Sequence, residues 1–363
     1  MAPVKPLGMV GIVLLLLVAC GPAATTAPTA GQEPVPYPLA ENGPYHVGMR
    51  TVEFVDDSRG GRQVSVTVWY PAVGPADPTS TGAARDAEPD RSAEPYPLIL
   101  SSTKMASTLA PYLVSHGFTW ASVDGIDTYT ALYEGAIDQP LDILFALDQV
   151  AANPPEGLEG LIDAENAGSI GYSFDGFNSL AMSGARIDPE YYLAQCPTPD
   201  ATTKAVLGDW SSFNCVPARQ WEKFTAHVGE STTSSQDGLW QPLTDKRIRA
   251  VMPMAGEGWW LFGERGLAAV DRPVLIIVAT EDELYKENGL IYEHLGTSDR
   301  TLISFVGETH GGMLNMPLTE RMAHFAVAFF GYHLQGREDY AAYFSQESVE
   351  QHDDLAWGVY EDN

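Results

Sequence analysis

The chain has 363 residues, with 48 acidic against 20 basic side chains and a formal net charge of −28 at pH 7. This excess of negative charge argues against nucleic acid as a partner and against electrostatic docking on anionic lipid, because both carry negative charge themselves. Hydrophobic residues make up 45% of the chain, which supports a full globular core.

The N-terminal segment has the pattern of an export signal. Lys5 provides a positive charge, residues 9–18 form an apolar run that is short for a transmembrane helix, and Cys20 follows the sequence Leu-Val-Ala. A cysteine in this position resembles the lipidated cysteine of bacterial lipoproteins. The alternative is an ordinary secretory peptide in which Cys20 stands by chance.

We predict a signal peptide over residues 1–19 and a polar tether, rich in Ala, Thr and Pro, over residues 20–44. The protein is then an exported lipoprotein of the cell envelope. We expect lipid on Cys20 to anchor it to the membrane, with the folded domain (45–363) on the extracytoplasmic side.

The first part of this domain predicts an antiparallel hairpin, because strands at residues 50–55 and 64–70 flank the turn-rich sequence Asp-Ser-Arg-Gly-Gly. Beyond it, short apolar strands alternate with helical segments. This alternation predicts an α/β fold, with a mostly parallel central sheet and helices on both faces. The predicted strands are residues 98–101, 118–123, 167–171, 248–254, 274–278 and 302–306, and the predicted helices are residues 109–116, 141–150 and 318–334.

The sequence Gly-Tyr-Ser-Phe-Asp-Gly places Ser173 at the corner between the strand 167–171 and a helical apolar pattern. A serine at such a corner exposes its hydroxyl, and the amide that follows points to where an oxyanion would form. The pattern matches the G-x-S-x-G nucleophile elbow, except that Asp175 replaces the last glycine. Its carboxylate would oppose an oxyanion if it pointed inward. The alternative is that it faces away and accepts hydrogen bonds from backbone amides.

About sixty residues with weak periodicity follow the elbow helix, and we predict that residues 186–247 form a cap over the active site. The alternative is a surface excursion without contact to substrate. This segment contains Cys196 and Cys215, which predict a disulfide in an exported protein, whereas two unpaired buried thiols are the alternative. Neither their spacing nor nearby histidines suggest a zinc site.

A carboxylate and a histidine follow the next two strands, in the chain order of α/β-hydrolases. Asp282 comes just after the strand 274–278, and His310 lies in a Gly-rich turn after the strand 302–306. Parallel strands bring their carboxyl ends to one edge of a sheet, so we expect both residues to lie near Ser173. In such a triad the histidine accepts the serine proton and the carboxylate orients the imidazole.

Four nearby residues have more than one interpretation. Glu257, which follows the preceding strand, and Glu281, adjacent to Asp282, are alternatives for the acid, because triad acids are defined by geometry and not by sequence position. Trp259 and Trp260 are candidates for contact with an acyl or aryl group of the substrate, and equally for packing in the core.

These residues resemble the bacterial α/β-hydrolases grouped with dienelactone hydrolases and platelet-activating-factor acetylhydrolases. The resemblance extends from Val47 to about Tyr340 and implies an α/β-hydrolase fold and a serine esterase with no metal and no cofactor. The segments that carry it are residues 47–51, 57–62, 66–72, 115–118 and 121–124, together with the elbow and the segments of Asp282 and His310.

The oxyanion hole is where the chain departs from this family. The family usually has Ser-His-Gly after its third strand, and the amides that follow help to bind the oxyanion. Residues 101–105 instead read Ser-Ser-Thr-Lys-Met, without the glycine. Because the donors are backbone N–H groups, the resemblance still implies the amides of Thr103 and Lys104, alongside that of Phe174.

Together these observations predict a single α/β-hydrolase domain that cleaves a carboxylic ester, either a small ester or a lipid-like one, through an acyl-enzyme. Phospholipid short-chain esters, lactones and polyester fragments fit equally, and the oligomeric state is left open. The alternative function is a catalytically impaired lipoprotein of the same fold that only binds its ligand, because a fold does not guarantee chemistry.

Overall fold

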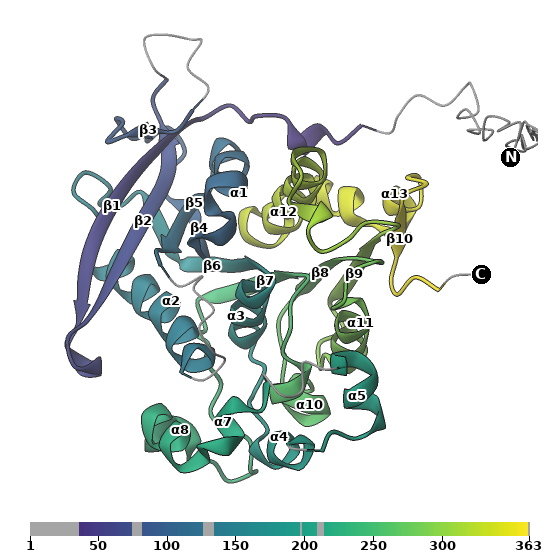
Figure 1. Ribbon diagram of the computed structural model, residues 1–363. Coiled ribbons are helices and arrows are strands. Elements are labelled where there is room, and N and C mark those ends of the chain that lie inside the picture. Colours follow the sequence, from purple (N-terminus) through teal and green to yellow (C-terminus); the bar gives the residue numbers. More distant parts are fainter. Residues whose placement is uncertain (1–35, 75–81, 126–133, 197, 209–213, 362–363) are drawn as a thin grey trace, which may run out of the picture. The chain divides into compact units, whose positions relative to one another are not determined.

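The central sheet of the computed structural model has ten strands: β1 (His46–Asp56), β2 (Arg62–Ala72), β3 (Ala84–Arg85), β4 (Tyr96–Ser102), β5 (Thr119–Val123), β6 (Ile162–Tyr172), β7 (Ile248–Met254), β8 (Val274–Ala279), β9 (Arg300–Phe305) and β10 (Leu355–Trp357). Their order across the sheet is β10-β9-β8-β7-β6-β4-β5-β2-β1-β3 (Figure 1). Across the sheet, the neighbouring strands β9, β8, β7, β6, β4 and β5 pair in parallel. Strand β2 pairs with β1 and β5, and β10 pairs with β9, in the antiparallel sense. The predicted α/β fold with a mostly parallel sheet is therefore confirmed.

The structure describes residues 36–74, 82–125, 134–196, 198–208 and 214–361. The predicted signal peptide and Cys20 lie outside these residues. The compact unit spans Tyr37–Asn363 and so begins before the predicted domain boundary at residue 45. It does so because the Tyr37 ring stacks on His352, with ring centroids 4.4 Å apart, and Leu39 is buried.

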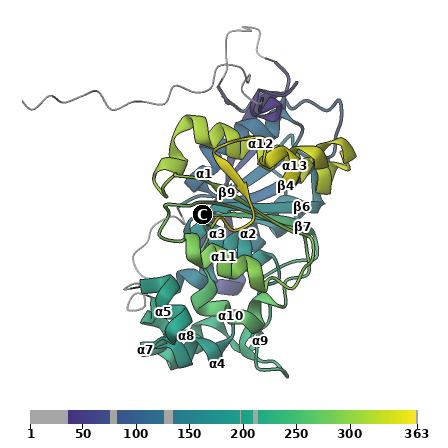
Figure 2. The same cartoon turned by 90° about the vertical axis from the view of Figure 1, so that its right-hand side faces the viewer.

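Helices cover both faces of the sheet. They are α1 (Thr103–Ser115), α2 (Gly135–Ala152), α3 (Phe174–Met182), α4 (Pro189–Gln195), α5 (Ala201–Leu207), α7 (Val216–Arg219), α8 (Trp221–Val228), α9 (Glu230–Thr233), α10 (Trp259–Leu267), α11 (Tyr285–His294), α12 (Met316–Gln335) and α13 (Gln346–Val349). In Figure 2, α1 and α12 lie on one face, and α2, α3, α10 and α11 lie on the other. Within the described residues, no helix is long and apolar enough to span a bilayer.

The centre of the sheet explains the continuous apolar runs of the sequence. Every residue of β4 and of β8 is buried, because helices cover both sides of these strands. β1 instead alternates between exposed and half-buried positions along much of its length, as expected for a strand near the edge of the sheet.

Helix α1 begins at Thr103, six residues before the helix predicted at 109–116. Its N-cap is Ser102, whose side-chain oxygen accepts a hydrogen bond from the Lys104 amide at 3.4 Å. Thr103 and Lys104 therefore lie in the first turn of a helix, where amide groups have no intrahelical acceptor.

Residues 186–247 contain five of the described helices, α4, α5, α7, α8 and α9. In Figure 1, α4, α7 and α8 lie below α3 and α10, and α5 lies beside α10 and α11. Cys196 and Cys215 form the predicted disulfide, with their Cα atoms 5.6 Å apart. The bond joins the end of α4 to the start of α7.

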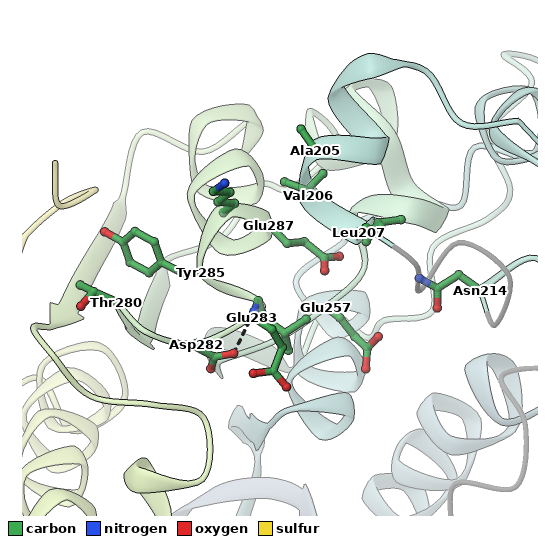
Figure 3. Close-up of a pocket in the computed structure, with 13 residues that line it drawn as sticks. Ala205, Val206, Leu207, Asn214, Glu257, Thr280, Asp282, Glu283, Tyr285 and Glu287 are labelled. Atoms are coloured by element: carbon green, nitrogen blue, oxygen red, sulfur yellow. Dashed lines mark hydrogen bonds between the residues drawn. The ribbon is translucent and has the colours of Figure 1, made fainter. Parts of the chain in front are cut away.

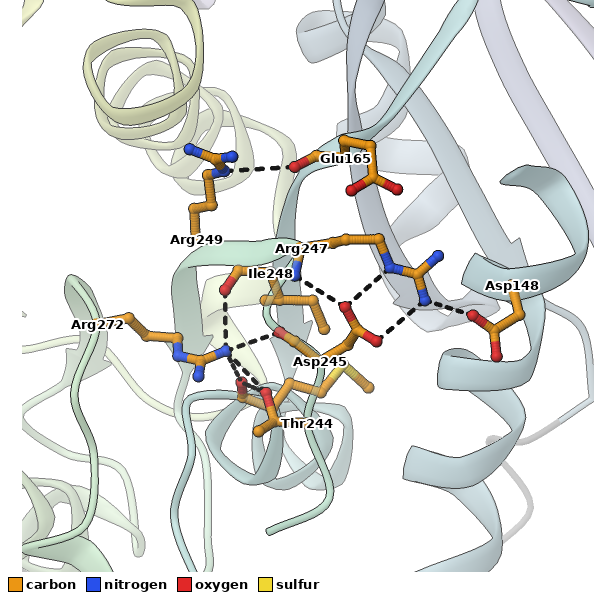
Figure 4. A network of polar contacts seen from close by, with 9 residues as sticks. Asp148, Glu165, Thr244, Asp245, Arg247, Ile248, Arg249 and Arg272 are labelled. Carbon is orange, nitrogen blue, oxygen red and sulfur yellow. Dashed lines mark hydrogen bonds and ion pairs between the residues drawn. The ribbon is translucent and has the colours of Figure 1, made fainter. Parts of the chain in front are cut away.

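A polar network fixes the point where this segment returns to the sheet (Figure 4). Arg247 bonds Asp148 of α2, and its Nε donates to Asp245 at 2.8 Å. Arg272, just before β8, donates from one nitrogen to the carbonyl oxygens of Met182 at 3.1 Å and Ile248 at 2.9 Å. The network thereby ties the end of the segment to α2, to the end of α3 and to β7.

Candidate active site

Ser173 occupies the turn between β6 and α3 with a strained backbone. Its φ of 63° and ψ of −125° are unusual for a residue with a side chain, and its amide donates to the Met254 carbonyl oxygen at 2.9 Å. Glycines allow the sharp turn: a Cβ at Gly171 would lie 2.1 Å from the Asp175 carbonyl oxygen, and one at Gly176 would lie 2.7 Å from the Gly256 Cα. The glycine that allows close packing is therefore Gly176, one position after Asp175.

The structure brings Ser173, His310 and Asp282 into one hydrogen-bonded chain. His310 Nε2 lies 3.2 Å from the Ser173 Oγ, and His310 Nδ1 lies 2.8 Å from the Asp282 Oδ2. The Asp282 side chain is fully buried, and its other oxygen accepts the Leu284 amide at 2.8 Å. The three residues follow β6, β9 and β8, so they meet at the carboxyl edge of the parallel strands.

The alternative acids lie elsewhere around this chain. Both ring nitrogens of His310 are engaged by Ser173 and Asp282. Glu257 is buried beside Asp282 in a neighbouring cavity, and Glu281 is exposed, with its amide bonded to the Glu308 carbonyl oxygen. Asp282 is therefore the carboxylate that this geometry assigns to His310.

Tyr172, which the sequence analysis did not single out, supports the backbone of His310. The Tyr172 hydroxyl donates to the His310 carbonyl oxygen, and the two rings lie 4.9 Å apart. Burial raises the pKa of the Tyr172 hydroxyl, which keeps it protonated as a donor. The only sequence signal was its place as the residue before Ser173 in the elbow.

The residues whose amides were predicted for the oxyanion hole lie at two helix N-termini. Phe174 begins α3 directly after Ser173, while Thr103 and Lys104 begin α1. The Lys104 ammonium also lies 5.7 Å from the centre of the Tyr172 ring. These helix ends orient N–H groups and positive partial charge in a manner suited to an anion.

Asp175 connects the two helix ends. The residue is 4% exposed, and its carboxylate oxygens accept the Ser102 amide at 3.1 and 3.2 Å. Asn178 Nδ2 donates to the same carboxylate at 3.2 Å. Asp175 thus bonds a backbone amide, the second of its two predicted alternatives. Burial raises its pKa to about 6, against the lowering effect of its hydrogen bonds.

Trp259 and Trp260 lie in the core, which was the alternative to a substrate contact. Each of the two residues is only 2% exposed to solvent. Trp260 packs edge-on against Tyr192 of α4, with ring centroids 5.7 Å apart, and stacks with Phe177 of α3 at 6.2 Å. The two indoles therefore join α10 to the helices around it.

A cavity of about 370 Å³ extends from Asp282 towards α5 and α11. Figure 3 shows four carboxylates gathered near one another in its wall, from Glu257, Asp282, Glu283 and Glu287. Glu287 Oε1 accepts the amides of Gly258 and Trp259 at 2.8 and 3.0 Å. Burial, followed by the charge of Glu257, raises the pKa of Glu287 to about 8.

Two groups of side chains in the described residues come close enough to share a cation, with ligand atoms within 4.8 Å of one another. One is Asp282, Glu283 and His310, of which two already form the hydrogen bond described above. The other, near the start of α2, is Glu134, Asp138 and His227, in which His227 Nε2 lies 2.9 Å from the Asp138 carboxylate.

No family model matches the chain, and no curated protein matches it. The interpretation of the site therefore depends on its geometry.

Proposed function

We propose that the protein is a serine hydrolase of the α/β-hydrolase fold, similar to dienelactone hydrolases and platelet-activating-factor acetylhydrolases, that cleaves carboxylic esters. The observation that carries this proposal is the chain of hydrogen bonds from Ser173 through His310 to Asp282, at 3.2 and 2.8 Å. The order of serine, acid and histidine along the sequence is that of α/β-hydrolases. The strained backbone of Ser173 also fits a nucleophile elbow.

In the first half of the reaction, the Ser173 Oγ attacks the ester carbonyl carbon while His310 Nε2 takes the hydroxyl proton. The carbonyl oxygen becomes an oxyanion, which the amides of Phe174 and Thr103 stabilise. The Lys104 amide joins them when it leaves its 3.4 Å hydrogen bond to the Ser102 side chain. As the tetrahedral intermediate collapses, the protonated His310 gives its proton to the alcohol that leaves. Asp282 holds the imidazole in the required tautomer and stabilises its charged form.

In the second half, a water molecule attacks the acyl group on Ser173, and His310 takes a proton from that water. Collapse of the second intermediate returns the proton to the Ser173 oxygen and releases the carboxylic acid. Small esters and lipid-like esters are the substrate classes that we propose, because the same machinery serves both.

We further propose that residues 186–247 cap the active site. Helices α4 and α5 of this segment pack against α10, and α5 also packs against α11. Leu207 and Asn214 line the cavity that reaches Asp282, so part of the segment lies beside the proposed triad. A cap in this place would exclude water and restrict the size of the substrate.

The proposed location is the cell envelope, with the protein anchored to the membrane by lipid on Cys20. The support for this is the apolar run at residues 9–18 followed by Leu-Val-Ala-Cys.

Steady-state hydrolysis of p-nitrophenyl acetate and butyrate by the purified full-length protein tests the function. We expect activity in the wild type and a loss of several orders of magnitude in turnover for Ser173→Ala, because a triad without its nucleophile retains only about 10³–10⁴-fold over water. The melting temperature should change little, since alanine keeps the same backbone strain. Activity retained by the alanine variant would refute the assignment, and an inactive wild type would favour a protein that only binds its ligand.

A further inference from the structure

We propose that Asp175 is a positioning residue: its buried carboxylate holds the Ser102 amide and so fixes the first turn of α1, whose amides bind the oxyanion. This inference rests on the proposed function, because it concerns the oxyanion hole of the same site. It also explains why this elbow carries an aspartate where an ordinary elbow carries glycine.

The contacts of Asp175 support such a clamp. Both of its carboxylate oxygens lie within 3.2 Å of the Ser102 nitrogen, although the two residues are 73 positions apart in the sequence. Ser102 is the last residue of β4 and the N-cap of α1, so the peptide held by Asp175 lies directly before the one that carries the Thr103 amide. The elbow and the opposite wall of the oxyanion hole are thereby joined by one side chain.

The carboxylate is itself held in place from the other side. Asn178, one helical turn further along α3, donates to Asp175 Oδ1 at 3.2 Å and to the Gln139 Oε1 of α2 at 3.0 Å. Both Asp175 and Asn178 are buried, so neither has room to swing away from Ser102. A shift of the backbone at Ser102 would therefore require this chain of hydrogen bonds to break.

The carboxylate of Asp175 is buried among neutral donors and one positive charge. Burial disfavours the ionised form and raises its pKa to about 6. Among the groups that face it, Ser102 of β4 and Asn178 of α3 are neutral donors, and Lys104 of α1 carries a positive charge that partly offsets the burial. Above pH 6 the carboxylate is ionised and accepts fully, whereas below pH 6 protonation weakens its hold on the Ser102 amide.

The test compares Asp175→Ala and Asp175→Asn with Asp353→Ala, which removes an exposed aspartate in the turn after α13. With p-nitrophenyl butyrate at pH 8, we expect Asp175→Ala to lower kcat about 10- to 100-fold, less than the 10²–10³-fold lost when an oxyanion donor is deleted outright. KM should stay within about twofold, because the oxyanion exists only in the transition state. Asp175→Asn keeps an acceptor oxygen for Ser102 and should recover most of the lost kcat, while Asp353→Ala should match the wild type.

Two further readouts separate positioning from simple packing. Below about pH 6, the kcat/KM of the wild type should fall to that of Asp175→Asn, because protonation of Asp175 leaves a neutral acceptor like that of the asparagine. The melting temperature of Asp175→Asn at pH 8 should be equal to or above that of the wild type, since a buried charge has been removed. A packing residue would instead lower the melting temperature and leave the pH profile unchanged.

An unchanged or increased kcat in Asp175→Ala would overturn the inference, and an increase would mean that the carboxylate opposes the oxyanion. That outcome leaves the esterase proposal standing, because the wild type is active. If the wild type and all variants hydrolyse no ester, both proposals fail together.

Discussion

In the proposed mechanism, Ser173 and the residues around it divide into those that react and those that hold the reacting groups. Ser173, His310 and Asp282 form the hydrogen-bonded chain, while Tyr172 fixes the His310 backbone and Asp175 fixes Ser102. Each supporting bond ends on a backbone atom. The supporting side chains therefore fix the main chain. In the proposed mechanism, the positions of the oxyanion donors and of the imidazole depend on that main chain.

The acid of the triad gives the sharpest prediction at this scale. Asp282→Asn should lower kcat by something like 10⁴-fold, because the amide stabilises the wrong tautomer of His310. Glu257→Gln, which changes a buried carboxylate beside it, should cost far less. Steady-state kinetics of both variants decide the question, and the reverse ranking would show that the acid follows β7.

Glu287 provides a prediction on the pH dependence of stability. Its pKa is raised to about 8 from an ordinary value of 4.5. At a pH between these two values, the folded protein therefore keeps a proton on Glu287 that the unfolded protein has already lost. The wild type should lose stability as the pH rises through this window, by up to about 1.4 kcal/mol per pH unit relative to Glu287→Gln. The glutamine keeps an acceptor for the Gly258 and Trp259 amides.

Urea unfolding of the wild type and Glu287→Gln at pH 6 and pH 9 measures this difference. Glu347→Gln, an exposed change in α13, is the matched control and should follow the wild type at both values. If the free energies of unfolding of the wild type and Glu287→Gln differ by the same amount at both pH values, the raised pKa is refuted.

At the level of elements, the helical segment 186–247 is cross-linked internally by a disulfide and is tied to the sheet by a polar network where it returns to β7. The Cys196–Cys215 bond links α4 to α7, and the Arg247 and Arg272 network holds the return to β7. Helices α4 and α5 of the segment pack on α10, α5 also packs on α11, and residues of α5 and α11 line the cavity beside Asp282. Loosening the segment should therefore affect access to the site before it affects the sheet.

We predict that reduction of the Cys196–Cys215 bond raises KM for bulky esters more than for acetate esters. The bond closes a loop over a separation of 19 residues, which corresponds to roughly 3 kcal/mol of stability on the chain-entropy model. The double variant Cys196→Ser, Cys215→Ser should behave like the reduced protein and no longer respond to reductant. Equal KM values before and after reduction would mean that the disulfide braces a segment with no role in substrate access.

How far the sequence predicted these elements depends on the range of the interactions that form them. The buried strands β4 and β8 were visible as apolar runs, and the residues of the proposed triad were visible because each comes within five residues of the end of a strand. The early start of α1 was missed, since Ser102 is a cap without apolar periodicity behind it. The Asp175–Ser102 bond joins residues 73 positions apart, and the buried partners of Glu287 lie 28 and 29 positions away, so no local pattern predicts them.

At the scale of the whole molecule, the acidic composition makes attachment to anionic lipid by charge alone unfavourable. Membrane attachment would then depend on lipid at Cys20. Several acyl chains hold a protein firmly, whereas a single chain binds only marginally.

Expression in a bacterial host tests this part of the account. The mature wild type should partition into detergent and carry extra mass on Cys20, and Cys20→Ala should be soluble or remain unprocessed. Mature protein cleaved at another position, without modification, would contradict the prediction.

The central claim is that Ser173 is an activated nucleophile, and labelling by a fluorophosphonate probe tests it most directly. Such probes form a covalent bond with a serine that a neighbouring base has activated, independently of which ester the protein prefers. We predict that the full-length protein is labelled, that peptide mapping places the label on Ser173, and that Ser173→Ala is not labelled. Absence of labelling in the folded wild type, or a label on another residue, would contradict the account.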